Sequence, residues 1–178
     1  MPTAKPPEGL SFDRLPTPIG EALLMWDAQG ALRIFDWSDY EARVQRQLAR
    51  LYGPVTPTPG RAPEAIVLAL GAYFEGEVTR IDDIPCASAG TPFQRAVWAA
   101  LRRIPAGTTQ SYSGLAAQIG HPTAVRAVGL ANGSNPIGLV VPCHRVIGAD
   151  GSLTGYGGGL ERKRWLLAHE GAAFKLAA

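Results

Sequence analysis

Residues 113–136 read "SGLAAQIGHPTAVRAVGLANGSNP" and contain two short helical patterns on either side of a tight turn. We expect a first helix around Gly114–Ile119, a turn at Gly120 and His121, and a second helix from Pro122 to about Asn132. Two short helices joined by a glycine turn form a helix-turn-helix pattern, although many helical hairpins look alike. The stretch therefore predicts a mainly helical region and leaves open what its helices meet.

The second of these helices has an unusual composition. Val125 and Val128 are expected to face inward, most of the other residues are small, and Arg126 is the only charged one. The major groove of DNA is about 12 Å wide and the minor groove about half that, so a helix of small residues suits the narrower groove. The alternative is close packing against another helix, with Arg126 solvated, and the composition alone leaves both open.

Just downstream, residues 138–148 read "GLVVPCHRVIG". We interpret Leu139–Val141 as a buried strand that stops at Pro142 and leaves Cys143 in a turn. Neighbouring side chains do not face each other in a strand or helix, so Cys143 and His144 are expected to communicate through a water. Positive neighbours favour the reactive thiolate, whereas the alternative is a buried, inert cysteine.

The last helical pattern, "LERKRWLLAHEG", begins near Leu160 and stops at Gly171. It places Glu170 on the apolar side of the helix, at the negative end of the helix dipole. A carboxylate there is costly unless a cation meets it, and Arg145 or a protonating His144 would serve. The hypothesis that follows is a relay from Cys143 through water and His144 to Glu170. The alternative is a solvated Glu170 at a frayed helix end.

The first half of the chain predicts a small α/β domain. Two strands, 22–26 and 31–37, are separated by the turn residues "DAQG", which indicates an antiparallel sheet. A helix follows from Ser38 to Gly53, with Ser38 and Glu41 as a capping box, and a shorter helix begins at Pro63.

The segment "CASAGTP" is the expected boundary between two domains. Residues 1–88 are predicted to form the α/β scaffold domain, and residues 89–178 a mainly helical domain that begins with a helix at Pro92. The expected fold class is therefore mixed α/β, of the α+β type. It combines a small N-terminal domain with an antiparallel sheet and a C-terminal domain with the helix-turn-helix.

Charge is divided unevenly along the 178 residues. Residues 1–90 carry 8 basic and 12 acidic groups, a net charge of −4, whereas residues 91–178 carry 9 basic and 3 acidic groups, a net charge of +6. This asymmetry favours contact between the C-terminal half and a polyanion, and ordinary surface variation is the alternative.

Composition also excludes several classes of protein. No run of apolar residues is long enough for a transmembrane helix, and the N-terminus lacks a secretory signal, so we expect a cytoplasmic protein that avoids membranes. The only cysteines are Cys86 and Cys143, and a disulfide between them is the disfavoured alternative. There is no zinc-type spacing of Cys and His, so no metal site is expected.

Taken together, these segments resemble the O6-alkylguanine-DNA alkyltransferases. The motif "VVPCHRVIG" carries the resemblance, together with "SYSGLAAQIG", "AVRAVGLANGSNP", "LTGYGGGLERKRWLLAHEG" and, upstream, "FQRAVWAALRRIPAGT". The resemblance is dense over residues 91–172 and looser over the first half of the chain. It implies DNA repair by direct reversal: a monomer takes the alkyl group from O6-alkylguanine, and from O4-alkylthymine, in double-stranded DNA onto its own cysteine. The transfer happens once per molecule and without a cofactor.

The resemblance also assigns roles to residues. Cys143 matches the alkyl acceptor, His144 the base that deprotonates it through water, Glu170 the acid that orients His144, and Asn135 the brace of the active-site turn. Tyr112 matches a tyrosine that rotates the target phosphate and bonds the base, and Arg126 matches the finger that replaces the flipped nucleotide. The other implied DNA contacts are Thr123, Ala124, Ala127 and Gly129, and the implied base pocket contains Val146, Tyr156, Gly157 and Gly158.

Three other functions compete with this one. A non-catalytic alkyltransferase-like protein would bind alkylated DNA, but such proteins lack the acceptor cysteine that Cys143 supplies. A helix-turn-helix regulator would need an effector or dimerisation segment, and none is evident. A Cys–His hydrolase would need a distant histidine, and nothing selects His121 or His169. The sequence departs from mammalian members at Gly157, where glycine keeps the backbone amide that the family uses, and at Gly138, which replaces a pocket-wall proline and suggests a wider pocket.

Overall fold

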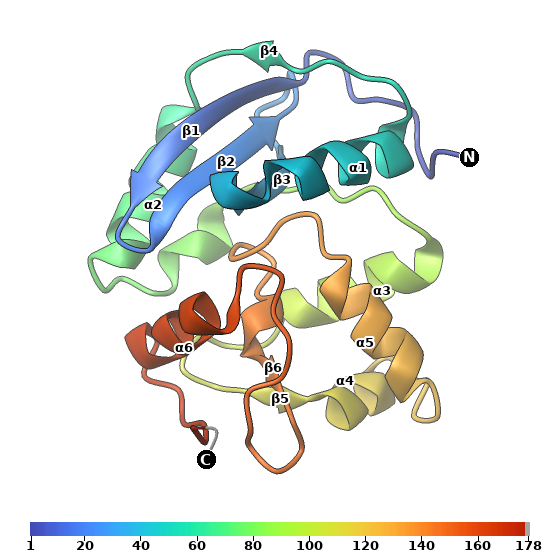
Figure 1. Cartoon of the computed structure of the whole chain (residues 1–178), viewed down its shortest axis with the longest axis vertical. Helices are drawn as coiled ribbons and strands as arrows, with labels where there is room; N and C mark the ends of the chain where they lie inside the picture. The colour runs from blue at the N-terminus through green and yellow to red at the C-terminus, as the bar shows by residue number, and fades with distance from the viewer. Residues whose placement is uncertain (177–178) are drawn as a thin grey trace. The chain divides into compact units, whose positions relative to one another are not determined.

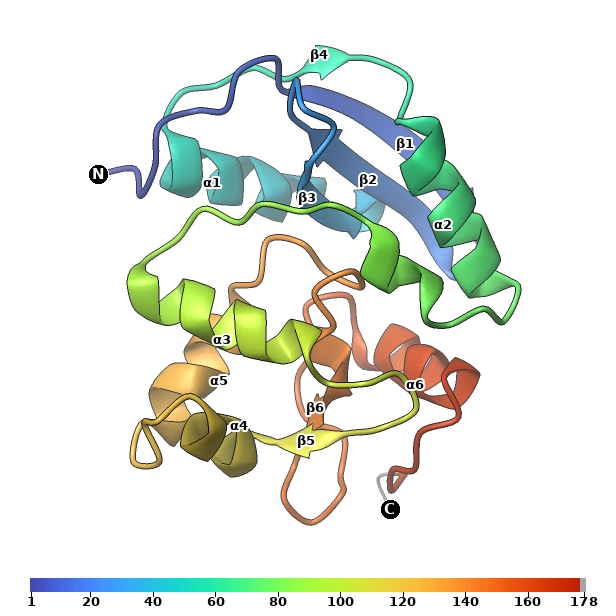
Figure 2. The same cartoon turned by 180° about the vertical axis from the view of Figure 1, so that it is seen from behind.

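The computed structural model describes residues 1–176. The chain divides into two compact units, one from Met1 to Thr91 and the other from Pro92 onward. Figures 1 and 2 show their helices and strands from opposite sides. Because the first unit contains an antiparallel sheet and the second is mainly helical, the predicted mixed α/β fold class is confirmed.

The first unit is built on a four-stranded sheet with strand order β3-β2-β1-β4. Its strands are β1 (Ser11–Thr17), β2 (Gly20–Trp26), β3 (Leu32–Trp37) and β4 (Thr58–Pro59). The first three are antiparallel neighbours, and the short β4 runs parallel to β1. Two turns of 3₁₀ helix, η1 (Ser38–Tyr40) and η2 (Arg80–Asp83), complete the unit with α1 and α2.

Helices α1 (Glu41–Tyr52) and α2 (Glu64–Phe74) cover opposite faces of this sheet (Figures 1 and 2). Leu23 and Met25 of β2 share a buried cluster with Val44 and Leu48 of α1. Successive side chains of a strand point to opposite faces, so Leu24 lies on the other side of the sheet, where it is also fully buried. Burial on both faces explains why β2 is an unbroken apolar run rather than an alternating one.

The sequence predicted part of this unit correctly and missed other parts. The two predicted strands are present as β2 and β3, but β1 was missed because its residues, "SFDRLPT", include charges and Pro16. The capping box at Ser38 is also wrong. Ser38 lies in η1, the helix begins at Glu41 without a side-chain cap, and the Glu41 carboxylate instead pairs with Arg14 at 2.8 Å. The helix ends before Gly53 (φ 75°), as predicted.

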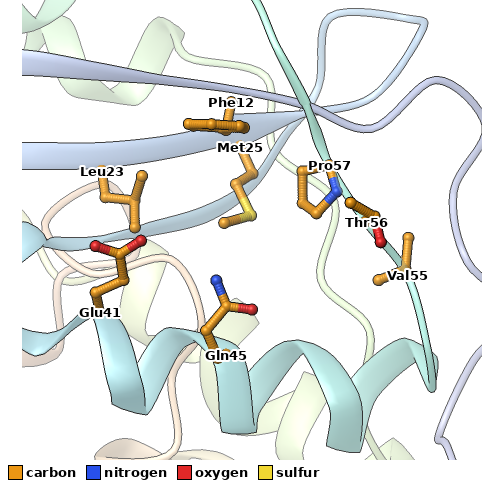
Figure 3. Close-up of a pocket in the computed structure, with 8 residues that line it drawn as sticks. All are labelled: Phe12, Leu23, Met25, Glu41, Gln45, Val55, Thr56 and Pro57. Atoms are coloured by element: carbon orange, nitrogen blue, oxygen red, sulfur yellow. The ribbon is translucent and has the colours of Figure 1, made fainter.

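A cavity of about 240 Å³ lies between the sheet and α1 in this unit (Figure 3). Its walls are about equally polar and apolar, with Glu41 and Gln45 reaching in from α1. Glu41 is paired with Arg14, and the residues that line the cavity include no Cys, His or Lys. The chemistry predicted from the sequence belongs to the second unit.

The second unit consists of short helices around a buried core. Its elements are α3 (Pro92–Arg102), β5 (Gln110–Ser111), α4 (Tyr112–Gln118), α5 (Val125–Gly133), η3 (Cys143–Arg145), β6 (Val146–Ile147) and α6 (Leu160–His169). Helix α3 packs against α4 and α5, and Trp98 Nε1 donates a hydrogen bond to the carbonyl oxygen of Ala131 at 2.9 Å. The two-residue strands β5 and β6 pair in parallel. Helix α3 begins at Pro92, where the sequence predicted it.

Helices α4 and α5 form the predicted helical hairpin. Ser111 caps α4 by accepting a hydrogen bond from the Gly114 amide at 3.0 Å. Gly120 (φ 79°) turns the chain between the helices in the left-handed region that glycine allows. The start of the second helix was predicted wrongly. The Ala124 amide bonds to the His121 carbonyl, which closes a turn over Pro122, so the helix begins at Val125.

Candidate active site

The segment before Cys143 is a tight buried turn, and the predicted strand over Leu139–Val141 is wrong. The Val140 amide bonds to the Gly138 carbonyl at 2.7 Å, and the Val141 amide to the Ile137 carbonyl at 2.9 Å. Leu139 has a φ of 63°, the only positive φ outside glycine among the described residues 1–176. Such a conformation costs a non-glycine residue roughly 1–3 kcal/mol, so the surrounding structure must hold it in place.

Asn135 supplies part of that support. Its Nδ2 donates a hydrogen bond to the Val141 carbonyl at 2.7 Å, and its Oδ1 accepts one from the Ile137 amide at 3.0 Å. One side chain therefore ties together the two ends of the turn that leads into Cys143. This geometry matches the bracing role that the resemblance implies for Asn135.

Cys143, His144 and Arg145 form the single turn η3, which contacts α3 and α6. All three side chains are buried, and Cys143 retains 8% exposure. Successive residues of a 3₁₀ helix project about 120° apart, so Cys143 and His144 leave the backbone in different directions. Proton transfer between them through a water therefore stays a prediction.

Glu170 is the point where three chain segments meet. His144 Nε2 lies 2.8 Å from Glu170 Oε1, while Arg145 donates from Nε to Oε2 at 3.0 Å and from Nη2 to Oε1 at 2.9 Å. The remaining Arg145 nitrogen, Nη1, donates to the carbonyl of Ile104 at 2.6 Å, in the loop after α3. The sequence predicted that Arg145 or His144 would meet this carboxylate, and both do.

The same loop passes close to the backbone of Glu170. Gly107 has a φ of 81°, and a Cβ at this position would lie 2.9 Å from the Glu170 carbonyl oxygen. Only glycine allows both the conformation and the close approach. Glu170 itself directly follows α6 as its C-cap residue, so its position depends on both the helix end and this loop.

Electrostatics determine the protonation of the pair. Burial on its own would raise the pKa of Glu170, but His144 and Arg145 outweigh it and lower the pKa to about 2, so the side chain is a carboxylate. Burial lowers the pKa of His144, and the neighbouring cations Arg145 and Lys163 lower it further, against the opposing effect of Glu170. A neutral His144 facing a carboxylate must carry its proton on Nε2. Nδ1 is then an unprotonated base, and it is buried without a hydrogen-bond partner among residues 1–176.

Lys163 belongs to this site and was missed from the sequence. It lies on α6 and is fully buried, and its Nζ donates to the carbonyls of Val146 at 2.7 Å and Thr154 at 3.1 Å. Burial lowers its pKa to about 8, against a smaller raising effect of Cys143. In the sequence it sits within the charged run "ERKR", which is typical of a solvated helix face, so only the fold identifies it.

The predicted base-pocket residues lie close to the same turn. Tyr156 is half-buried, and its ring packs edge-on against His144 with centroids 6.4 Å apart. Gly157 is exposed, whereas Gly158 is buried and its carbonyl accepts a hydrogen bond from Arg162. Val146 is buried, and its carbonyl has one lone pair left beside the bond from Lys163.

The predicted DNA contacts lie on and before α5. Arg126 and Ala127 are exposed on the helix, Gly129 is half-buried beside the Tyr112 ring, and Thr123 and Ala124 lie in the turn that precedes it. The Tyr112 hydroxyl is 2.8 Å from Thr154 Oγ1, which joins the start of α4 to the loop before α6. The structure thus groups Cys143, His144, Glu170 and Asn135 around η3, and places Arg126 apart from them on the hairpin.

No group of three or more His, Cys, Asp or Glu side chains within residues 1–176 is arranged to hold a metal ion. Over the same residues, no helix is both long and apolar enough to cross a membrane.

Comparison with known proteins places this arrangement in a family. The model of the 6-O-methylguanine DNA methyltransferase DNA-binding domain matches residues 92–172. The methylated-DNA–protein-cysteine methyltransferase of Salmonella typhimurium is 48% identical over 165 residues, which cover 89% of this chain and 94% of that protein. The Mycobacterium bovis protein of the same name is 56% identical over 129 residues, or 70% of this chain and 77% of its own.

Comparison with solved structures supports the same family. The crystal structure of Mycobacterium tuberculosis OGT in complex with DNA matches with a TM-score of 0.78 and 44% identity, covering 90% of this chain and 92% of that one. The crystal structure of the Mycobacterium tuberculosis O6-methylguanine methyltransferase matches with a TM-score of 0.74 and 43% identity, covering 91% and 93%. The fold and these matches therefore define a protein of DNA alkylation repair.

The chain belongs to the methylated-DNA–protein-cysteine methyltransferase family. It is a DNA-binding enzyme of direct-reversal repair, and the alternative of a non-catalytic binding protein is not favoured.

Proposed function

We propose that Cys143 accepts the alkyl group of O6-alkylguanine in double-stranded DNA, and also that of O4-alkylthymine. The observation that carries the proposal is the buried cluster of His144, Arg145 and Glu170, which adjoins Cys143 in one turn of chain. The cluster fixes a neutral imidazole with a free Nδ1, which is what a base near a thiol requires.

The chemistry balances as a single displacement. The Cys143 thiol gives its proton through a water to His144 Nδ1, and the Glu170 carboxylate, held in place by Arg145, stabilises the resulting imidazolium. The thiolate sulfur attacks the alkyl carbon, an S–C bond forms, and the bond from that carbon to guanine O6 breaks. Guanine leaves with the electron pair as an anion and takes up, through water, the proton that His144 received, which leaves His144 neutral again. The thioether product has no built-in route back, so each molecule acts once and needs no cofactor.

Delivery of the base is the role proposed for the hairpin. An alkylated guanine is stacked inside the duplex and must be flipped out, at a cost of a few kcal/mol. Arg126, exposed on α5, fills the space that the base leaves, while Tyr112 helps to rotate the phosphate. Thr123, Ala124, Ala127 and Gly129 present little bulk toward the backbone of the narrow groove.

Val146, Tyr156, Gly157 and Gly158 are proposed to receive the flipped base. Tyr156 offers a ring beside His144, and the carbonyl of Val146 and the backbone amides of the glycine loop offer hydrogen bonds to the purine edge. We further propose that the protein works as a monomer in the cytoplasm.

Intact-mass measurement tests the proposal directly. After incubation with a duplex carrying one O6-methylguanine, we expect a gain of one methyl group per protein, which peptide mapping places on Cys143. Cys143→Ser serves as the matched control and should stay unmodified. Binding of the duplex without any mass gain in the unmutated protein would contradict the proposal and favour a binding protein.

Arg126 is tested by comparing two substrates. Arg126→Ala should repair duplex DNA more slowly but react almost normally with free O6-benzylguanine, because a free base needs no flipping. Equal losses on both substrates would rule out the finger role.

A further inference from the structure

Helix α5 is proposed to enter the narrow groove because its residues are mostly small. Leu130 is the large side chain that this reasoning does not explain. It is 72% exposed, and among the large apolar side chains of residues 1–176 only Met1 is more exposed. The rest of the exposed surface of α5 is Arg126 and small residues. A single exposed leucine is ordinary on a protein surface, so its position relative to Arg126 decides what it means.

The helical period places Leu130 beside Arg126. Residues of an α-helix are about 100° apart around the axis, so Leu130 lies about 40° from Arg126 and about 6 Å further along. The buried residues of α5, Val128, Ala131 and Asn132, centre on the opposite side of the helix. Arg126 and Leu130 therefore both project from the outward crest of α5, and a surface that receives one also meets the other.

The charge around Arg126 and Leu130 indicates which kind of partner surface α5 meets. From residue 84 to residue 149 the sequence contains five arginines and neither Asp nor Glu. A helix within such a segment attracts a polyanion, and this segment overlaps the match to the DNA-binding domain, residues 92–172. A protein partner with an apolar patch alone would not require this absence of acidic groups.

We propose that Leu130 packs against the apolar deoxyribose walls of the DNA minor groove, next to the nucleotide that Arg126 displaces. This rests on the proposed function, since it needs α5 to enter that groove. A groove about 6 Å wide must widen to accept a leucine on the exposed face of the helix. Apolar side chains that insert into the minor groove unstack and bend neighbouring base steps. With a base-pair rise of about 3.4 Å, Leu130 falls within about two steps of Arg126.

The test measures binding of the full chain to an undamaged duplex, on which no alkyl transfer takes place. Leu130→Ala should weaken binding about three- to ten-fold, the effect of losing one partly buried apolar contact. The dependence on salt should not change, whereas Arg126→Ala should reduce the salt slope by about one. Leu130→Met keeps the apolar volume and should restore most of the affinity. Leu68→Ala is the matched control, because Leu68 is a 60% exposed leucine on α2 of the other unit, and it should bind within about two-fold of the unmutated protein.

Two further readouts make the outcome decisive. In a second duplex that carries one O6-methylguanine, fluorescence of 2-aminopurine two steps from the lesion should rise on binding and rise less with Leu130→Ala. Reaction of Leu130→Ala with free O6-benzylguanine should stay the same. Unchanged duplex affinity in Leu130→Ala would overturn the proposal, as would a change confined to self-association in sedimentation. A failure of the proposed function itself is distinguishable, because it would show as no methyl transfer by the unmutated protein.

Discussion

His144 Nε2 and Glu170 Oε1 lie 2.8 Å apart, and both side chains are closed to solvent. Their residues are 26 positions apart, and Arg145 holds the same carboxylate from a second direction. A buried carboxylate with two cationic or hydrogen-bonding partners is stable as an anion, and that anion fixes the tautomer of the histidine. The pair therefore sets which imidazole nitrogen is available to the Cys143 side.

Replacing Glu170 by Gln should slow alkyl transfer because the amide no longer stabilises a protonated His144. We expect a loss of about ten-fold or more in the single-turnover rate, by analogy with general-base contributions of about 10²–10⁴. The rate is read from transfer of a labelled methyl group from duplex DNA under excess protein. Duplex affinity should stay within about two-fold, and an unchanged transfer rate would refute the relay.

Acid should destabilise the fold through the same residue. The pKa of Glu170 is about 2 in the folded chain and near 4.5 when unfolded, so its stabilisation is complete above about pH 4.5 and is lost as the pH falls toward 2. A shift of this size corresponds to about 3 kcal/mol. Urea unfolding at pH 7, 5 and 3 measures the change in free energy. The Glu170→Gln variant should lose less stability over this range, and an identical pH dependence would contradict the assignment.

Lys163 should favour the thiolate of Cys143. Its pKa is about 8, lowered mainly by burial, so below pH 8 it is a buried cation that interacts with Cys143. Lys163→Met keeps the volume and removes the charge, and should shift the midpoint of iodoacetamide alkylation of Cys143 to higher pH. Circular dichroism checks that the variant is folded. Lys175→Met, which changes an exposed lysine, is the control. Equal pH midpoints of alkylation in the two variants would show that Lys163 does not act on Cys143.

The parts of the site that the sequence predicted are those with a strong physical cost. A carboxylate on the apolar side of a helix needs a cation, and this requirement pointed from Glu170 to Arg145 and His144 before the fold was known. A thiol and an imidazole on adjacent residues cannot face each other in regular structure, which pointed to an intermediary. Both arguments depend on local geometry and charge, which a sequence records directly.

The parts that were missed depend on tertiary structure. Leu139–Val141 is a run of branched apolar residues, which predicts a buried strand equally well, and only the surrounding contacts hold Leu139 at a positive φ. Lys163 is surrounded by charged residues in the sequence, so its burial is visible only once α6 is placed against Val146 and Thr154. The late start of α5 has a local cause instead, because the Ala124 amide bonds to the His121 carbonyl and closes a turn over Pro122.

Thr154 should act as a positioning residue for Tyr112, whose hydroxyl lies 2.8 Å from Thr154 Oγ1. The Thr154 carbonyl is in turn held by Lys163, so the hydroxyl pair connects the hairpin to the active-site loop. Thr154→Val keeps the shape and removes the partner, and should cost about 0.5–1.5 kcal/mol of stability. It should also slow repair of duplex DNA several-fold, with a smaller effect on free O6-benzylguanine, because Tyr112 is proposed to act on the phosphate. Thr154→Ser restores the hydroxyl and should recover the duplex rate; a serine variant as slow as the valine variant would show that packing, rather than the hydrogen bond, matters.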